Sequence, residues 1–223
     1  MKTLVVSPHP DDEVLGCGGT LLKRMENGGE IAWIIMTTME GLNIWSDERI
    51  AKRKIEISLI QEKLNIKTKN LYELGYKATF LDQAPKREII EKIQYIFSQF
   101  QPEEILVPHG SDIHSDHRVS FEAVTACTKR FRCPSVKKIL CYEVMSETDQ
   151  NINTKQDHFV ANYYVDISNY LEEKINMLKI YENEIGEHPF PRSLQGIEAL
   201  SIVRGAQMGK EHAEAFQLLR NYE

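Results

Sequence analysis

Residues 3–13 of the chain read Thr3-Leu4-Val5-Val6-Ser7-Pro8-His9-Pro10-Asp11-Asp12-Glu13. The first five of these residues predict a short β-strand, which ends at Pro8 because proline cannot donate a hydrogen bond to a sheet. A histidine and several carboxylates follow this strand directly. Ligand sites in open parallel α/β sheets lie beyond the carboxyl ends of strands, so this turn is well placed for chemistry. His9 and Asp12 are three residues apart in a tight turn and can point the same way.

Apolar runs alternate with amphipathic stretches along the rest of the chain. Further strands are predicted at residues 31–37, 70–74, 104–107, 138–142 and 159–165. Helices are predicted to start near Ser46, Pro85, Ser115 and Ser168, and a last helix or two should close the chain. This alternation predicts an α/β fold, namely a Rossmann-like, mostly parallel sheet with helices on both faces. The length suits a single domain over residues 1–223 with a C-terminal elaboration.

A second stretch rich in histidine and aspartate follows the strand predicted at residues 104–107. It reads His109-Gly110-Ser111-Asp112-Ile113-His114-Ser115-Asp116-His117-Arg118. His114 and His117 are three residues apart, so the first turn of a helix would bring them to one face. Because it follows the strand predicted at residues 104–107, this stretch, like the first, lies at the carboxyl end of a strand.

Together the two stretches supply a candidate metal site. Two imidazoles and one carboxylate, with one position left for water, are ligands typical of a catalytic zinc. The residues are His9, Asp12 and His117, and Asp11, His114 and Asp116 remain for proton transfer. Either stretch alone would be equally typical of a helix N-cap or a surface ion pair. Their occurrence at two strand ends of one predicted sheet favours a functional site.

The composition narrows the classes of partner. The formal net charge is −6 and the basic residues are spread along the chain, which argues against nucleic acid as a partner. The N-terminal residues lack the apolar region of a signal peptide, and no apolar run has the length of a transmembrane segment. The four cysteines form no C-x-x-C pair. We therefore expect a cytoplasmic protein with reduced thiols, and a homo-oligomer remains open.

Some residues near the motifs have ordinary structural interpretations. Gly16, Gly18 and Gly19 do not form a G-x-G-x-x-G motif, and we expect them to allow close packing of a helix on the sheet. Cys17 is expected to be a small packed residue rather than a ligand. His188 lies in a stretch with two prolines, which predicts a surface loop.

The two stretches resemble the hallmark motifs of the LmbE-like, or PIG-L-type, family of zinc-dependent N-acetylglucosamine deacetylases. The family has His-Pro-Asp-Asp-Glu after its first strand and a later His-x-Asp-His, which residues 9–13 and 114–117 match. Weaker similarity covers nearly the whole chain, including Arg53-Lys54-Ile55-Glu56 and the C-terminal Ala213-Glu214-Ala215-Phe216.

The resemblance implies a cofactor, a substrate class and a set of ligands. His9, Asp12 and His117 match the zinc ligands of the family, and Asp11 matches its general base. One Zn²⁺ per chain is implied, with Fe²⁺ as an alternative occupant. The implied substrate is a small N-acyl amino sugar or a conjugate of one, and the implied reaction is removal of an acetyl group from its nitrogen, in glycan or glycoconjugate biosynthesis.

The resemblance also implies roles for residues outside the ligand set. His114 matches the residue that stabilises the oxyanion and protonates the leaving amine. Asp116 would accept a hydrogen bond from His114 and favour its imidazolium form. Arg53 matches an arginine that contacts substrate, although Arg49 lies one helical turn away.

One position departs from the family pattern. Many members have an acidic residue shortly after the third strand that binds a sugar hydroxyl, whereas residues 74–79 contain none and Asp82 is the nearest. The departure puts the identity of the sugar in question and leaves the hydrolysis unaffected.

Two other functions stay open. Two histidines and one carboxylate also describe the metal sites of non-haem iron enzymes, although those enzymes usually have β-sandwich folds. The other alternative is a non-catalytic sugar- or nucleotide-binding module.

Overall fold

The chain folds around one seven-stranded sheet. The computed structural model describes residues 1–152 and 158–223. The order of strands across the sheet is β3-β2-β1-β4-β5-β7-β6. The strands comprise Lys2–Ser7 (β1), Glu30–Thr38 (β2), Leu71–Lys77 (β3), Glu104–Pro108 (β4), Lys138–Tyr142 (β5), Tyr163–Asp166 (β6) and Ala213–Asn221 (β7).

The first five strands are parallel, and β7 is antiparallel to both of its neighbours, β5 and β6. Helices connect the parallel strands, as the alternation of apolar and amphipathic stretches predicts. The helices comprise Asp12–Glu26 (α1), Asp47–Lys63 (α2), Lys86–Phe100 (α3), Ser115–Cys127 (α4), Leu171–Ile180 (α5) and Leu194–Met208 (α6), with short 3₁₀ turns at Thr68–Asn70, Leu81–Gln83 and Glu182–Glu184. The predicted α/β fold with a mostly parallel sheet is confirmed.

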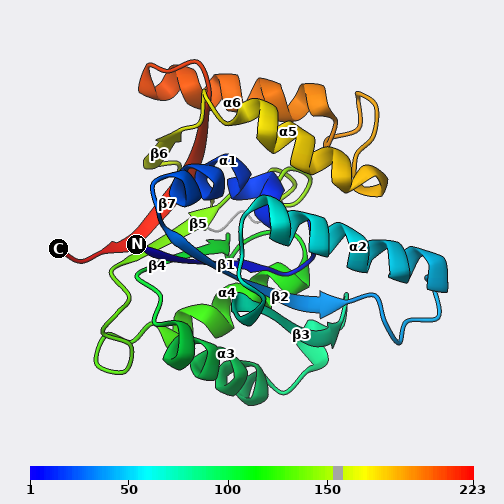
Figure 1. Cartoon of the computed structure of the whole chain (residues 1–223), viewed down its shortest axis with the longest axis vertical. Helices are drawn as coiled ribbons and strands as arrows, with labels where there is room; N and C mark the ends of the chain where they lie inside the picture. Colours follow the sequence, from blue (N-terminus) through cyan, green and yellow to red (C-terminus); the bar gives the residue numbers. More distant parts are fainter. Residues whose placement is uncertain (153–157) are drawn as a thin grey trace.

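Helices cover both faces of the sheet and define two hydrophobic cores. Figure 1 shows α1, α2, α5 and α6 on one face and α3 and α4 on the other. Side chains alternate along β1, so Val5 faces the first core and Leu4 and Val6 face the second. Because both faces are covered, the central strands are almost continuously apolar.

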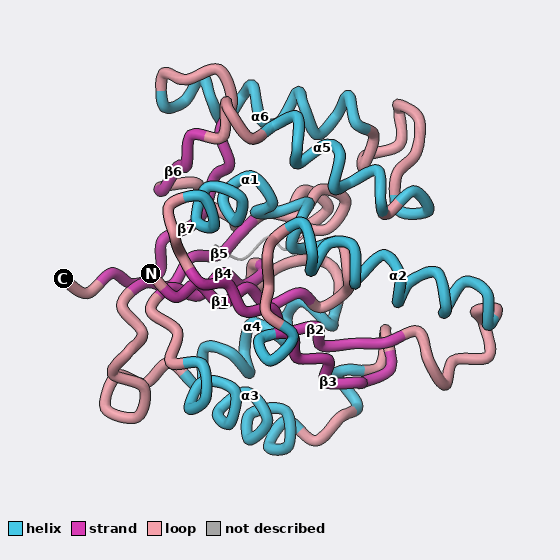
Figure 2. The backbone as a smooth tube through the Cα atoms, in the orientation of Figure 1, coloured by secondary structure: helices cyan, strands magenta, loops and turns pink. Residues whose placement is uncertain are grey.

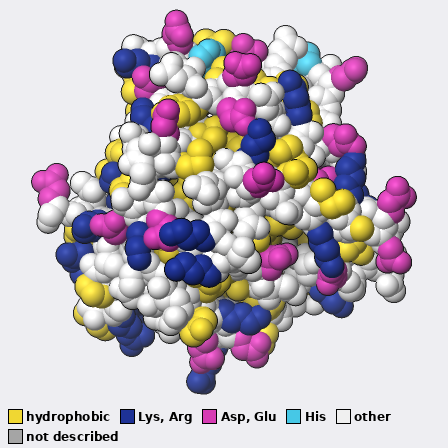
Figure 3. All heavy atoms as spheres, viewed as in Figure 1, with side chains coloured by type: hydrophobic (Ala, Val, Ile, Leu, Met, Phe, Trp, Pro, Cys, Tyr) yellow, Lys and Arg dark blue, Asp and Glu magenta, His cyan; other side chains and the backbone are white. Residues whose placement is uncertain are grey.

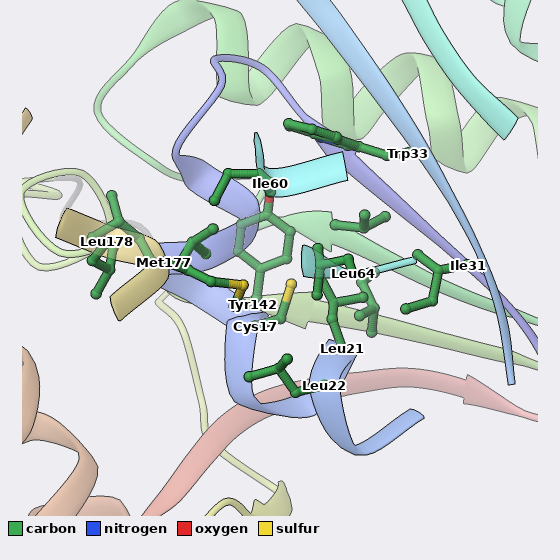
Figure 4. Close-up of a cluster of buried hydrophobic side chains, with 14 of the residues drawn as sticks. Cys17, Leu21, Leu22, Ile31, Trp33, Ile60, Leu64, Tyr142, Met177 and Leu178 are labelled. Carbon is green, nitrogen blue, oxygen red and sulfur yellow. The ribbon is translucent and has the colours of Figure 1, made fainter. Parts of the chain in front are cut away.

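Helix α1 packs closely on the sheet through its glycines. A Cβ on Gly16 would lie 2.2 Å from the ring of Tyr142, and one on Gly19 would lie 2.8 Å from Ile167. Figure 4 shows the Tyr142 ring standing beside α1 among the labelled apolar side chains, Cys17 among them. Cys17 is completely buried. The expectations of close helix packing and of a packed Cys17 are therefore confirmed.

Helix α1 is interrupted at Cys17, whose φ of −148° is not helical. The amides of Gly19 and Thr20, at the start of the second half, donate to the carboxylate of Glu214 at 2.9 and 2.7 Å. Glu214 comes from β7 and is also paired with the buried Lys174 at 2.7 Å. The C-terminal motif thus supplies the cap for a helix formed near the N terminus.

The C-terminal region differs from the sequence expectation. A last helix or two were expected after the loop, but α6 is followed by the nine-residue strand β7. Its first residues are rich in Ala and Glu, which favour helix, and pairing with β5 on one side and β6 on the other overrides that local preference. The helix expected from Ser168 begins at Leu171, because the Ser168 hydroxyl binds Asp166 instead of capping a helix.

Charges of both signs lie on the face of the molecule drawn in Figure 3, where acidic and basic side chains are interspersed. Within the described ranges, every helix is too short or too polar to cross a membrane.

Candidate active site at the carboxyl edge of the sheet

The turn after β1 is held in place by hydrogen bonds from β2 and α1. The carbonyl of Pro8 accepts from the amide of Thr37 at 3.1 Å and from its hydroxyl at 2.7 Å. The amide of His9 donates to Asp12 Oδ2 at 2.8 Å. These contacts place His9 and Asp12 on the same side of the turn, as their spacing predicts.

Asp11 has a strained backbone, with a φ of 145°. Its amide donates to the carboxylate of Glu13 at 3.1 Å, which holds this conformation. The same carboxylate is completely buried and accepts hydroxyl hydrogen bonds from Ser7 at 3.0 Å and Tyr181 at 2.8 Å. Burial raises the pKa of Glu13 to about 7, although these hydrogen bonds oppose the shift. Glu13 therefore stabilises the backbone conformation of the turn.

Three side chains converge with the geometry of metal ligands. Asp12 Oδ2 lies 3.6 Å from His9 Nδ1 and 3.4 Å from His117 Nε2. Bonds of about 2.1 Å in a tetrahedral zinc site put ligand atoms about 3.4 Å apart. His117 is completely buried, and within the described residues its Nε2 has no hydrogen-bond partner. A buried, unpartnered imidazole nitrogen facing a carboxylate fits a divalent metal ion.

Each of the two histidines is oriented by an outer aspartate. Asp112 Oδ2 lies 2.9 Å from His117 Nδ1, and Asp116 Oδ2 lies 3.0 Å from His9 Nε2. Both carboxylates are completely buried. Asp116 is itself fixed by the amides of Thr79 at 2.7 Å and Leu81 at 3.2 Å. A carboxylate on the outer nitrogen leaves the lone pair of the inner nitrogen for a metal.

These contacts shift the pKa values of the converging groups. Burial lowers the pKa of His9, but hydrogen bonds to Asp116 and Asp12 outweigh it and raise the pKa to about 9. For His117 the neighbouring Asp12 and Asp112 likewise outweigh burial and raise the pKa well above its usual value. Burial would raise the pKa of Asp12, but His117 and His9 hold it well below its usual range. These shifts favour the charged forms of His9, His117 and Asp12, so charges of both signs meet at the point where the three side chains converge.

His114 does not make the hydrogen bond expected of it. Its Nδ1 accepts from the amide of Asp116 at 3.1 Å as the N-cap of α4, and lies 4.0 Å from Asp116 Oδ2. The Asp116 carboxylate is instead engaged by His9. Burial, with His9 and His117 close by, lowers the pKa of His114 to about 4. The hydrogen bond expected between His114 and Asp116 is therefore not formed in this geometry, and with Nδ1 accepting the amide, the neutral form of the ring would carry its proton on Nε2.

His9, His114 and Asp116 form a second group of potential ligands that shares His9 with the first. In this group Nδ1 of His114 already accepts a hydrogen bond, and Nε2 of His9 is already paired with Asp116. The first group, with its unpartnered nitrogen on His117, fits a metal ion better.

The structure separates the two candidate arginines. Arg53 is buried, lines the cavity and donates to the carbonyl of Pro10 and to Glu184. Arg49 pairs with Glu56 at 3.2 Å and with Glu184 at 3.0 Å and is absent from the cavity wall. Of the two arginines, Arg53 is therefore the one that lines the cavity.

Arg192 is a site residue that sequence reasoning missed. Its Nη1 lies 3.5 Å from Asp11 Oδ2, and its Nη2 lies 3.8 Å from Glu184. It lies at the end of the loop that contains His188, far from the motifs in sequence, and no spacing rule connects it to Asp11. His188 itself is exposed, as expected of a loop residue.

A cavity of about 830 Å³ opens over these groups. The predicted residues on its wall are His9, Asp11, Asp12, Arg53 and His114, whereas Asp116 and His117 are buried and are not among the lining residues. Burial, with Asp12 and Glu184 nearby, raises the pKa of Asp11 well above its usual value, although Arg53 and Arg192 oppose the shift. Asp82 is exposed and is not among the lining residues, whereas Glu73 on β3 is.

Known proteins with a similar sequence or fold include several deacetylases. Diacetylchitobiose deacetylase of Thermococcus kodakarensis is 23% identical over 230 residues, which cover 98% of this chain and 83% of that protein. The solved N,N′-diacetylchitobiose deacetylase of Pyrococcus horikoshii superimposes with a TM-score of 0.75 at 22% identity, covering 98% of this chain and 84% of that one. A hydratase of Pseudomonas putida, the 4-carboxy-2-hydroxymuconate hydratase GalB, has a TM-score of 0.74 at 15% identity, covering 100% and 98% of the two chains.

The fold alone therefore does not select the reaction, and the family must be identified from the sequence. Residues 4–128, which include both motifs, match the family described as PIG-L, GlcNAc-PI de-N-acetylase. Because the match spans more than half of the chain, the protein belongs to the PIG-L family of de-N-acetylases.

Proposed function

We propose that the protein is a zinc-dependent hydrolase that removes the acetyl group from the nitrogen of an N-acetylglucosamine-type amino sugar. The observation that carries this proposal is the convergence of His9, Asp12 and His117 beneath a cavity whose wall also holds Asp11 and His114. Membership of a de-N-acetylase family supports the reaction class. A role in glycan or glycoconjugate biosynthesis is part of the same proposal.

His9, Asp12 and His117 are the residues that would hold the zinc. When bound there, zinc would lower the pKa of a water molecule to about 7 and polarise the acyl oxygen. Asp112 and Asp116 keep the two imidazoles turned toward the metal position. The protein's contribution at this stage is a fixed and partly desolvated set of ligands.

Asp11 acts as the base. Its carboxylate lies in the cavity wall beside the ligand Asp12, is 4% exposed, and is oriented by Arg192. It accepts a proton from the attacking water, whose oxygen bonds to the acyl carbon. The same proton then passes from Asp11 to the departing nitrogen, so that the products are acetate and a free amine.

His114 stabilises the negative charge that develops on the acyl oxygen. Because its Nδ1 accepts the Asp116 amide, the neutral ring presents Nε2–H to the cavity. A donor of this kind is typically worth about 10²–10³ in rate. Arg53, held by Pro10 and Glu184, also lines the cavity and is available to the sugar hydroxyls.

The test is acetate release from N-acetylglucosamine and its glycosides by the zinc-loaded protein. We expect stoichiometric acetate and free amine, loss of activity with a chelator, and recovery with zinc. Oxygen consumption in the same assay would indicate a non-haem iron enzyme instead. Tight sugar binding without acetate release would indicate a non-catalytic binding module.

A further inference from the structure

Helix α5 ends beside the turn that carries the proposed base. It lies next to α1 and α2 on one face of the sheet (Figure 2). Its last turn is followed by Tyr181 and the 3₁₀ turn Glu182–Glu184. Tyr181 is completely buried and lies outside both sequence motifs. It takes no part in the reaction steps described above.

The hydroxyl of Tyr181 reaches the base through one carboxylate. It donates to Glu13 Oε1 at 2.8 Å, and Glu13 Oε2 accepts from the amide of Asp11 at 3.1 Å. The Ser7 hydroxyl donates to the same Oε2 at 3.0 Å and accepts the indole N–H of Trp33 at 2.9 Å. All four supporting side chains are completely buried. Both oxygens of Glu13 are therefore fixed, one by the end of α5 and the other by β1 and the turn.

The backbone of Asp11 needs this support. Its φ of 145° lies in a region that residues other than glycine rarely adopt, and such strain persists only where the surroundings hold it. Arg192 contacts the side chain of Asp11, whereas Glu13 holds its amide. If Glu13 turned away, the φ angle could relax and move the carboxylate from the water that it must deprotonate. A displacement of about 1 Å can lower a rate about 10²-fold.

The ring of Tyr181 makes a second contact that does not involve the hydroxyl. The guanidinium carbon of Arg53 lies 5.3 Å from the centre of the ring, within the range of about 6 Å for a cation–π contact. Arg53 lines the cavity, where a substrate can meet it. The hydroxyl and the ring of one side chain thus serve different groups, and they can be tested separately.

We propose that Tyr181 is a positioning residue with two separable parts: its hydroxyl orients the base Asp11 through Glu13, and its ring orients Arg53. This inference rests on the proposed deacetylase function, because Asp11 is the base of that reaction. The hydroxyl governs turnover, and the ring governs how well the substrate is held. The alternative is a packing role, in which loss of the hydroxyl would affect stability alone.

The test measures kcat and KM for acetate release by zinc-loaded variants, with the best substrate among N-acetylglucosamine and its glycosides. Tyr181→Phe removes only the hydroxyl and should lower kcat about tenfold, with KM within about twofold of the original value. Tyr181→Leu removes the ring as well, so it should also raise KM about fivefold through loss of the cation–π contact. Both variants should keep one zinc per chain.

Tyr142→Phe is the matched control. Tyr142 is also completely buried, and its hydroxyl donates to the backbone carbonyl of Val6 at 2.7 Å. Each Phe variant loses one buried hydroxyl, so both should unfold at a lower temperature, but only Tyr181→Phe should lose kcat. If kcat is the same in the two variants, the inference is overturned. If the original protein releases no acetate, the proposed function fails and this inference with it.

A double variant shows whether the hydroxyl acts through Asp11. In Asp11→Asn, which lacks the base, adding Tyr181→Phe should lower kcat no further, because the group that it positions is already lost. A further tenfold loss in the double variant would contradict a role through Asp11.

Two variants of Glu13 test the link itself. Glu13→Gln keeps the size of the side chain, and its oxygen can accept the Asp11 amide while its NH₂ group donates to the Tyr181 hydroxyl. It should therefore keep most of kcat, whereas Glu13→Ala should lose at least as much as Tyr181→Phe. A Glu13→Ala variant with the original kcat would rule out the link.

Discussion

At the scale of single residues, the proposed metal position depends on side chains that would not touch the metal. Asp112 and Asp116 are buried carboxylates on the outer nitrogens of His117 and His9. Such partners fix the orientation of each ring and raise its basicity as a ligand. His114 has no carboxylate on its Nδ1, because that nitrogen accepts a backbone hydrogen bond as the N-cap of α4. We therefore do not count it among the proposed metal ligands.

This difference predicts how metal affinity changes with each residue. Asp112→Asn and Asp116→Asn should weaken zinc binding about 10–100-fold, the usual effect of losing an outer carboxylate. His114→Ala should leave zinc affinity unchanged and lower turnover. Competition with a chromophoric chelator measures the affinities. Zinc lost from His114→Ala but retained by Asp112→Asn would show that the ligands are assigned incorrectly.

Arg192 gives a second prediction at this scale. Arg192→Met removes the cation 3.5 Å from Asp11 Oδ2, so the base loses its orientation and kcat should fall about tenfold or more. KM should change less, and Arg192→Lys should recover part of kcat because it restores the charge. Steady-state kinetics with zinc content measured alongside would decide this. A change in KM alone would assign Arg192 to substrate binding.

At the scale of elements, β7 holds the interrupted helix α1 in place. Glu214 accepts two amides of α1 and pairs with the buried Lys174. Glu214→Ala would leave buried donors and a buried cation unpaired, so we expect a loss of about 3–5 kcal/mol in the free energy of unfolding. Urea unfolding measures it.

The double variant Glu214→Ala with Lys174→Met is the control for that prediction. It removes the unpaired cation and should recover part of the lost stability, because replacing both members of a buried pair costs less than removing one. A Glu214→Ala protein as stable as the original would mean that the helix interruption needs no cap from β7.

Elements with a strong local pattern were predictable from the sequence. The strand at residues 138–142 has the predicted bounds, and Ser46 caps α2 as expected by accepting from the amide of Arg49. Strand β7 was not predictable, because its pairing with β5 and β6 outweighs its own composition.

In the candidate site, too, residues within short motifs were predictable, whereas contacts between distant segments were not. The convergence of His9, Asp12 and His117 was predictable because short motifs follow strands whose carboxyl ends share one edge. The contact between Arg192 and Asp11, and the choice of His9 over His114 as the partner of Asp116, depend on how distant segments pack. Neither contact can be predicted from the spacing of residues in the sequence.

At the scale of the whole molecule, all four cysteines are buried free thiols. Burial raises the pKa of Cys127 to about 12 and raises those of Cys17 and Cys141 as well, so the reactive thiolate is scarce at neutral pH. The folded protein should therefore react very slowly with an aromatic disulfide reagent, and all four thiols should react after unfolding. Rapid labelling of the folded protein would contradict the burial of these residues.

The central claim joins one metal position to one base, and it is tested by measuring bound zinc and acetate release on the same preparations of the original protein, His117→Ala and Asp11→Asn. We expect one zinc per chain in the original protein, little or none in His117→Ala, and full occupancy in Asp11→Asn with turnover reduced about 10²–10⁴-fold. Near-normal acetate release by zinc-loaded Asp11→Asn, or undiminished activity in His117→Ala without metal, would contradict the account.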